Sequence, residues 1–168
     1  MIVIDCFEDI YNILYKCKFI QNNNRKSLAY NKGGFSNPVG LKYDYIKKDY
    51  AIPRFDEVNG EEVFIEISKF IDRWLKEKKI DFRFNTLTIN KNFACNYHID
   101  QNNMGESLLF TVGDFVGGRL MMQTSYDGED FVEFIDIHNK PFIFKGNQIK
   151  HKTEDFNGLR FCIVAYWI

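Results

Sequence analysis

The sequence predicts a mainly β fold, a double-stranded β-helix (jelly roll) preceded by helices. Beyond Asp81, short runs rich in Phe, Ile, Val, Thr and Tyr alternate with Gly, Asn and Asp at intervals of roughly ten residues, which is typical of strands joined by turns. Before Asp81, apolar residues instead recur at helical spacing. A length of 168 residues suits one domain over 1–168, with helices and a loop in 1–80 and the β-helix in 81–168.

Two amphipathic helices are expected in the first half. Asp5 and Glu8 have the spacing of a capping box, and the apolar residues that follow predict a helix from 6 to about 17. A second helix begins after Asn59-Gly60, where one apolar stripe extends from Val63 to Leu75. This stripe should pack against a sheet.

Eight strands are expected in the second half. We place them near 82–90, 95–100, 107–112, 118–124, 131–137, 141–145, 148–152 and 158–167. Asp127-Gly128 and Gly146-Asn147 have the composition of hairpin turns. Eight short strands after two helices favour a jelly roll with the helices on one face.

Composition excludes several classes of protein. With 45% hydrophobic and 27% charged residues, the chain has enough apolar surface to fold and is not a disordered protein. No apolar run approaches the ~18 residues of a membrane span, and the N-terminus lacks the pattern of a secretory signal. We therefore expect a cytoplasmic or nuclear protein with no membrane partner. The four cysteines form no CxxC pair, which favours reduced, buried thiols.

Positive charge is concentrated in residues 16–48. This segment holds eight Lys or Arg residues against one acid, Asp44, whereas the whole chain has a net charge of -1. Aromatic residues are interleaved with the basic ones, as in grooves that bind single-stranded nucleic acid. The alternative is a solvated surface loop, because Gly33, Gly34, Pro38 and Gly40 favour irregular structure.

The three histidines are the candidates for chemistry. His98-Ile99-Asp100 puts an imidazole and a carboxylate on one face of a predicted strand, where both could bind one metal ion. A histidine on a later strand would complete the two-histidine, one-carboxylate triad of non-haem iron sites. His151 is the better third ligand, because Arg160 follows on an apolar strand and could bind an anionic co-substrate. His138, in a polar turn, is expected to be a surface histidine.

These motifs occur in the order His98-x-Asp100, Gly117-Gly118, His151 and Arg160. In this order, residues 82–168 resemble the Fe(II)- and 2-oxoglutarate-dependent dioxygenases, whose fold is a cupin-like double-stranded β-helix. The stretch from Asn90 to Gly118 is most similar to the branch of the J-base thymine hydroxylases and ten-eleven-translocation methylcytosine dioxygenases. The ending from His151 to Ile163 resembles prolyl hydroxylases.

The resemblance implies a site and a reaction. His98, Asp100 and His151 would bind Fe(II), 2-oxoglutarate would chelate the iron, and Arg160 would bind the C5 carboxylate of 2-oxoglutarate. O2 is the oxidant of such hydroxylases. Thr88 and Asn90 have the strand parity to hydrogen-bond the co-substrate.

Two features of this motif set leave alternatives open. Cys162 stands where many relatives have Ser or Thr, so Tyr97 or Tyr166 is expected to supply the missing hydroxyl, or else co-substrate binding is weaker. Gly117-Gly118 either lets the backbone approach the substrate or forms a bulge at the start of a strand.

The substrate stays open at the level of the sequence. The first hypothesis is a nucleobase of DNA or RNA, with residues 25–48 as a lid over an extruded base. The second is a protein side chain, as in prolyl hydroxylases, with the same lid over a peptide. A small molecule is a further option, and a non-catalytic jelly-roll binding module is the alternative from a different class.

Overall fold

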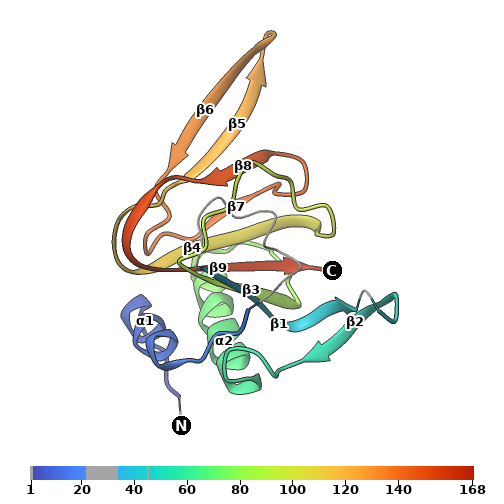
Figure 1. Cartoon of the computed structure of the whole chain (residues 1–168), viewed down its shortest axis with the longest axis vertical. Helices are drawn as coiled ribbons and strands as arrows, with labels where there is room; N and C mark the ends of the chain where they lie inside the picture. Colours follow the sequence, from blue (N-terminus) through green and yellow to red (C-terminus); the bar gives the residue numbers. More distant parts are fainter. Residues whose placement is uncertain (1, 22–33, 45) are drawn as a thin grey trace.

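The computed structural model describes residues 2–21, 34–44 and 46–168, and within them two antiparallel sheets pack against each other (Figure 1). The larger sheet has the strand order β2-β1-β3-β9-β4-β7, and the smaller sheet has the order β6-β5-β8. The strands are β1 (Phe35–Asp44), β2 (Asp49–Arg54), β3 (Thr86–Lys91), β4 (Met104–Gly117), β5 (Leu120–Tyr126), β6 (Glu129–Ile135), β7 (Phe142–Phe144), β8 (Lys150–Thr153) and β9 (Phe156–Trp167). This is the predicted jelly roll.

The two predicted helices are present, as α1 (Phe7–Lys16) and α2 (Glu61–Lys78). Both cover the face of the large sheet that points away from the small sheet (Figure 1). The cap of α1 differs from the prediction by one residue, because Asp9 rather than Glu8 accepts the N–H groups of Asp5 and Cys6, at 2.8 and 3.2 Å. An acidic side chain at this position also complements the helix dipole.

The sheets and helices enclose two apolar cores. The first lies between the helices and the large sheet and includes Leu14, Ile67, Ile89 and Phe161. The second lies between the two sheets and contains Leu109, Leu120, Met122, Ile137, Phe144 and Cys162. Each fully buried side chain of this size stabilises the fold by about 1.5–3 kcal/mol. Because side chains alternate between the two faces of a strand, every second side chain of β3 and β9 faces the space between the sheets.

Residues 35–44 correct the prediction of irregular structure within 16–48. They form β1, which pairs with β2 and adds to the large sheet beside β3, from Phe35↔Lys91 to Gly40↔Thr86. Pro38 is tolerated because β2 pairs with β1 only from Gly40 onward, so no outer strand needs the missing N–H at Pro38. Of the predicted lid over 25–48, residues 25–33 and 45 lie outside the described residues.

Three further details differ from the prediction. Residues 95–100 do not form a strand, and His98 instead makes an isolated bridge with His151. The strand predicted from 82 begins only at Thr86. Gly146-Asn147 lies in a turn that links β7 to β8 in the other sheet, so it is not a hairpin turn. Asp127-Gly128 is the predicted hairpin turn, with positive φ at both residues.

Candidate functional site

His98, Asp100 and His151 converge between the two sheets. The backbones of His98 and His151 exchange two N–H···O=C hydrogen bonds of 3.0 Å, which brings the loop before β4 alongside β8. Asp100 Oδ1 lies 3.3 Å from His98 Nε2, and Asp100 Oδ2 lies 3.4 Å from His151 Nε2. One ligand atom from each residue lies within 4.8 Å of the other two, which is close enough to share one metal ion.

The tautomers of the two histidines suit metal binding. In each ring, Nδ1 lies 2.7 Å from the backbone carbonyl oxygen two residues earlier, of Asn96 for His98 and of Ile149 for His151. A carbonyl only accepts, so Nδ1 carries the proton and the lone pair of the neutral ring is on Nε2. Both Nε2 lone pairs then face the Asp100 carboxylate, an arrangement that needs a cation between them. The donor set therefore fits a divalent metal such as Fe(II).

Asp100 is held in its charged form. Burial alone would raise the pKa of this carboxyl, but His151 and His98 outweigh burial when their rings are protonated at Nε2 as well, and they then hold its pKa well below the ordinary value. The carboxylate is thus available as a ligand at neutral pH.

One cavity contains this triad together with the other predicted site residues. Thr88 and Asn90 of β3 and Arg160 and Cys162 of β9 all line it. They share a face because Asn90 pairs with Cys162 and Thr88 with Val164 across the two strands. The apolar side chains of the wall include Leu109, Leu120, Ile137 and Phe144. The structure thus brings all seven predicted site residues to a single cavity.

Arg160 is fixed in the wall of this cavity and is only 3% exposed. Its Nε and Nη2 both donate to the carbonyl oxygen of Gly118, at 3.2 and 2.9 Å. The rings of Phe115 and Phe156 lie 5.8 and 5.3 Å from the guanidinium carbon, within the range of cation–π contacts. Asn92 accepts the backbone N–H of Arg160 at 2.8 Å through its side chain. These contacts hold the guanidinium in one position.

Gly118 of the glycine pair contacts Arg160, which the sequence did not predict. Gly118 has a φ of +71°, and a Cβ on it would lie 2.7 Å from Arg160 Nε. The backbone at Gly118 therefore approaches Arg160 closely. The contacts of Asn92 and Gly118 with Arg160 were not predicted, because a backbone carbonyl and a short amide leave no motif in the sequence.

The two tyrosines considered as replacements for Ser or Thr lie in different places. Tyr166 lines the cavity, and its hydroxyl lies 2.8 Å from Thr88 Oγ1. Tyr97 is not among the residues that line the described cavity and packs against the Lys152 ammonium instead, at 5.4 Å from the ring. Burial raises the pKa of the Cys162 thiol, so this side chain is a neutral group in the wall.

His138 is not part of the triad, but it is not a free surface histidine either. It is half-buried, its Nε2 lies 3.1 Å from the carbonyl oxygen of Gly113, and its ring packs on Phe115 at 4.5 Å. Because Phe115 also contacts Arg160, His138 supports the far side of the Arg160 pocket.

Comparisons with known proteins identify the fold. Neither the models of protein families nor the curated proteins give a match to this sequence. Among solved structures, a 2OG-Fe(II) oxygenase family oxidoreductase from Burkholderia pseudomallei matches with a TM-score of 0.63 and 12% identity, over 95% of this chain and 76% of that chain. A prolyl hydroxylase from Trichoplax adhaerens, in complex with a hypoxia inducible factor peptide fragment, matches with a TM-score of 0.60 and 13% identity, over 96% and 77%.

NgTET1 in complex with 5mC DNA also matches, with a TM-score of 0.53 and 16% identity, over 79% of this chain and 60% of that chain. The chain thus has the double-stranded β-helix fold of the 2OG-Fe(II) oxygenases. Similarity to both a prolyl hydroxylase and NgTET1 supports no single branch. In the described residues, no helix combines the length and apolar character needed to cross a bilayer.

Proposed function

We propose that this protein is an Fe(II)- and 2-oxoglutarate-dependent dioxygenase that hydroxylates a C–H bond of its substrate. The observation that carries the proposal is the convergence of two Nε2 atoms and one carboxylate on a single point, in a cavity that also contains a buried arginine. When bound, Fe(II), 2-oxoglutarate and O2 supply the oxidising chemistry, in which 2-oxoglutarate becomes succinate and CO2 while the substrate gains one oxygen atom.

The residues of the chain position these groups. His98, Asp100 and His151 hold the metal, with the two Nε2 lone pairs directed at it by hydrogen bonds at Nδ1. Arg160 binds the C5 carboxylate of 2-oxoglutarate, since it is the buried cation of the same wall. Asn90 lines the same cavity and offers its side-chain amide to the co-substrate.

Three further groups of the wall complete this assignment. Thr88 and Tyr166, already hydrogen-bonded to each other, offer hydroxyls to the co-substrate. Cys162 occupies the space beside Arg160 as a neutral thiol. The apolar side chains of Leu109, Leu120 and Phe144 exclude water from the metal.

Anaerobic titration with Fe(II) and then 2-oxoglutarate tests this function. The visible absorption of an iron-bound keto acid should develop in the wild type and be absent in Asp100→Ala. Arg160→Ala should still bind Fe(II) but require more 2-oxoglutarate, and His138→Ala should still bind Fe(II). If the folded wild type takes up no Fe(II), the protein is a jelly-roll binding module instead.

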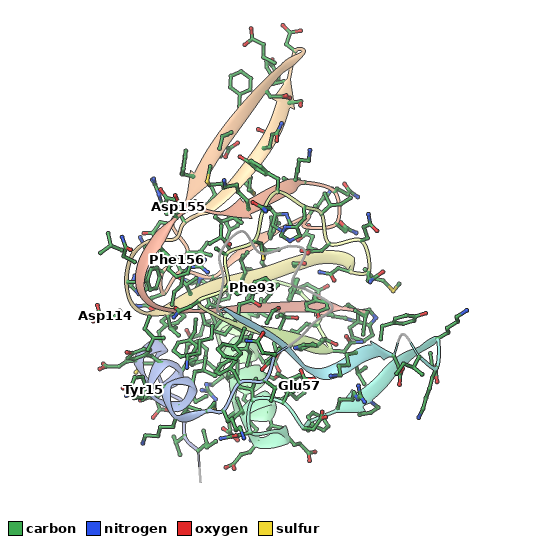
Figure 2. The ribbon with its side chains drawn as sticks, in the orientation of Figure 1. Tyr15, Glu57, Phe93, Asp114, Asp155 and Phe156 are labelled. Atoms are coloured by element: carbon green, nitrogen blue, oxygen red, sulfur yellow. The ribbon has the colours of Figure 1, made fainter. Side chains whose placement is uncertain are left out.

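Two classes of substrate follow from the sequence, a nucleobase and a protein side chain. The hypothesis of a nucleobase substrate is supported by the basic segment 16–48 and by the similarity of the fold to NgTET1. However, the basic side chains described in this segment do not gather at the cavity. Lys42, a residue of β1, is in an ion pair with Glu57, which is labelled in Figure 2. Lys47 and Lys48 lie in the β1–β2 turn, about 20 Å along β1 from the position opposite Thr88.

A further inference from the structure

The β5–β6 hairpin projects from the molecule beyond the cavity (Figure 1). The two strands pair along their whole length, from Leu120↔Ile135 to Tyr126↔Glu129, but β8 pairs with β5 only from Leu120 to Gln123. The outer half is therefore a two-stranded ribbon, whose side chains extend away from the body (Figure 2). A ribbon of this kind is marginally stable by itself.

Large apolar side chains are nevertheless exposed on this ribbon. Phe131, Val132 and Phe134 are 46%, 45% and 46% exposed, and Tyr126 is 77% exposed. Exposed apolar side chains that gather on one element mark interaction surfaces. The hairpin therefore has the character of a docking surface.

One face of the hairpin continues the wall of the metal site. Leu120 lines the cavity, and Met122 lies directly opposite His151, so both belong to the face that carries the metal ligand. Alternation puts Thr124 and Tyr126 on the same face farther out, together with their partners Phe131 and Glu129. Met122 is paired with His151 on one side and with Glu133 on the other. Two strand spacings, about 10 Å, therefore separate the backbones of Glu133 and His151.

This face, which we call the hairpin inner face, is acidic and aromatic. It consists of Thr124, Tyr126, Glu129, Phe131 and Glu133, and the two glutamates lie on either side of Phe131 along β6. Residues 120–135 contain four acidic and no basic residues. Lys150 and Lys152 of β8 alternate with His151 and so point to the opposite face of the sheet, although Lys152 also borders the cavity. The negative charge is thus on the side of the metal.

We propose that the hairpin inner face binds a basic, extended stretch of a polypeptide substrate and directs one of its side chains into the cavity. This inference rests on the proposed function, whose substrate class it names. Lys and Arg side chains are attracted by Glu129 and Glu133 and bind the faces of Phe131 and Tyr126 through cation–π contacts. Nucleic acid is disfavoured here, because its phosphates require Lys or Arg and would meet carboxylates.

An extended conformation of the substrate fits the edge of the small sheet. β6 is its outermost strand, so among the described strands the outer backbone groups of β6 have no partner. An extended peptide can pair with such an edge while its alternate side chains contact the adjoining face. A peptide strand paired with β6 would lie three strand spacings, about 14 Å, from β8, so the target side chain must come from a part of the substrate that continues past the base of the hairpin toward the metal.

Fluorescence anisotropy with three labelled probes tests the proposal. The probes are a peptide as long as β6 that alternates Lys and Ser, the same peptide with Glu in place of Lys, and a single-stranded oligothymidylate of equal length. They are titrated with the wild type, with Glu129→Gln/Glu133→Gln, and with Glu61→Gln/Glu77→Gln. The last variant is the matched control, because it removes the same charge from the exposed side of α2.

The wild type should bind the Lys peptide in preference to the other two probes. The hairpin variant should bind it about fivefold more weakly, as expected for the loss of two exposed charge pairs, and the α2 variant should bind it like the wild type. Equal binding by both variants, or preferred binding of the oligonucleotide, would overturn the proposal.

Fe(II) and 2-oxoglutarate uptake is measured in parallel on each protein. Normal uptake without binding of the Lys peptide overturns the docking surface and leaves the dioxygenase standing. Binding of the Lys peptide through Glu129 and Glu133 without uptake overturns the dioxygenase and supports the docking surface.

Discussion

Replacing Gly118 with Ala tests how the Arg160 guanidinium is held. The added Cβ would lie 2.7 Å from Arg160 Nε and 3.0 Å from Arg160 Cδ, closer than any normal contact. The Arg160 side chain must therefore move, and its two hydrogen bonds to the Gly118 carbonyl oxygen lengthen or break. The metal ligands do not contact Gly118 and should keep their geometry.

The expected effect on co-substrate binding follows from these contacts. Hydrogen bonds of a charged group contribute about 1.5–3 kcal/mol, and each ~1.4 kcal/mol is a factor of ten in affinity. If Arg160 binds the C5 carboxylate, Gly118→Ala should weaken 2-oxoglutarate binding about ten- to a hundredfold. A separate loss of about 1–2 kcal/mol in stability is expected, because an L residue is disfavoured at the positive φ of this position.

Gly128→Ala is the matched control for the backbone effect. Gly128 has a φ of +79°, close to that of Gly118, and a Cβ there would meet nothing within 4 Å. Both variants should lose similar stability in urea, but only Gly118→Ala should bind 2-oxoglutarate more weakly in the anaerobic titration. Unchanged 2-oxoglutarate affinity in a folded Gly118→Ala protein would refute the role assigned to Arg160.

Two further predictions concern ion pairs away from the cavity. Lys42→Ala should destabilise the protein by about 3 kcal/mol in urea unfolding, because it leaves the carboxylate of Glu57 buried without its ion-pair partner. Lys42→Met/Glu57→Met removes both charges and should cost much less stability. Equal losses in the two variants would contradict this explanation. The hydrogen bonds from Arg119 hold the pKa of Glu154 below its ordinary 4.5, so the ionised carboxylate stabilises the fold at neutral pH. This stabilisation is lost as the pH falls below 4.5 and through the lowered pKa of Glu154 in the folded protein. The difference in Tm between the wild type and Glu154→Gln should therefore be largest near pH 7 and vanish in acid, and a difference independent of pH would exclude this ion pair as its source.

Periodic local patterns account for the parts of the fold that could be predicted. The apolar stripe from Val63 to Leu75 is a local property of α2, and Asp127-Gly128 defines its hairpin turn through the positive φ of two adjacent residues. β1 could not be recognised in this way. Its Pro38 and Gly40 are poor strand formers, and the strand exists because β3 supplies its hydrogen-bond partners.

The types and the order of the chemical groups can be recognised from the sequence alone: two histidines, one aspartate and one arginine on successive segments of a β-rich chain. Tertiary structure decided their geometry. His98 meets His151 through a bridge between residues 53 positions apart, and Arg160 is oriented by the backbone of Gly118. The face of the β5–β6 hairpin that adjoins the metal likewise depends on strand register. Such contacts depend on the pairing of distant segments, which leaves no periodic pattern along the chain.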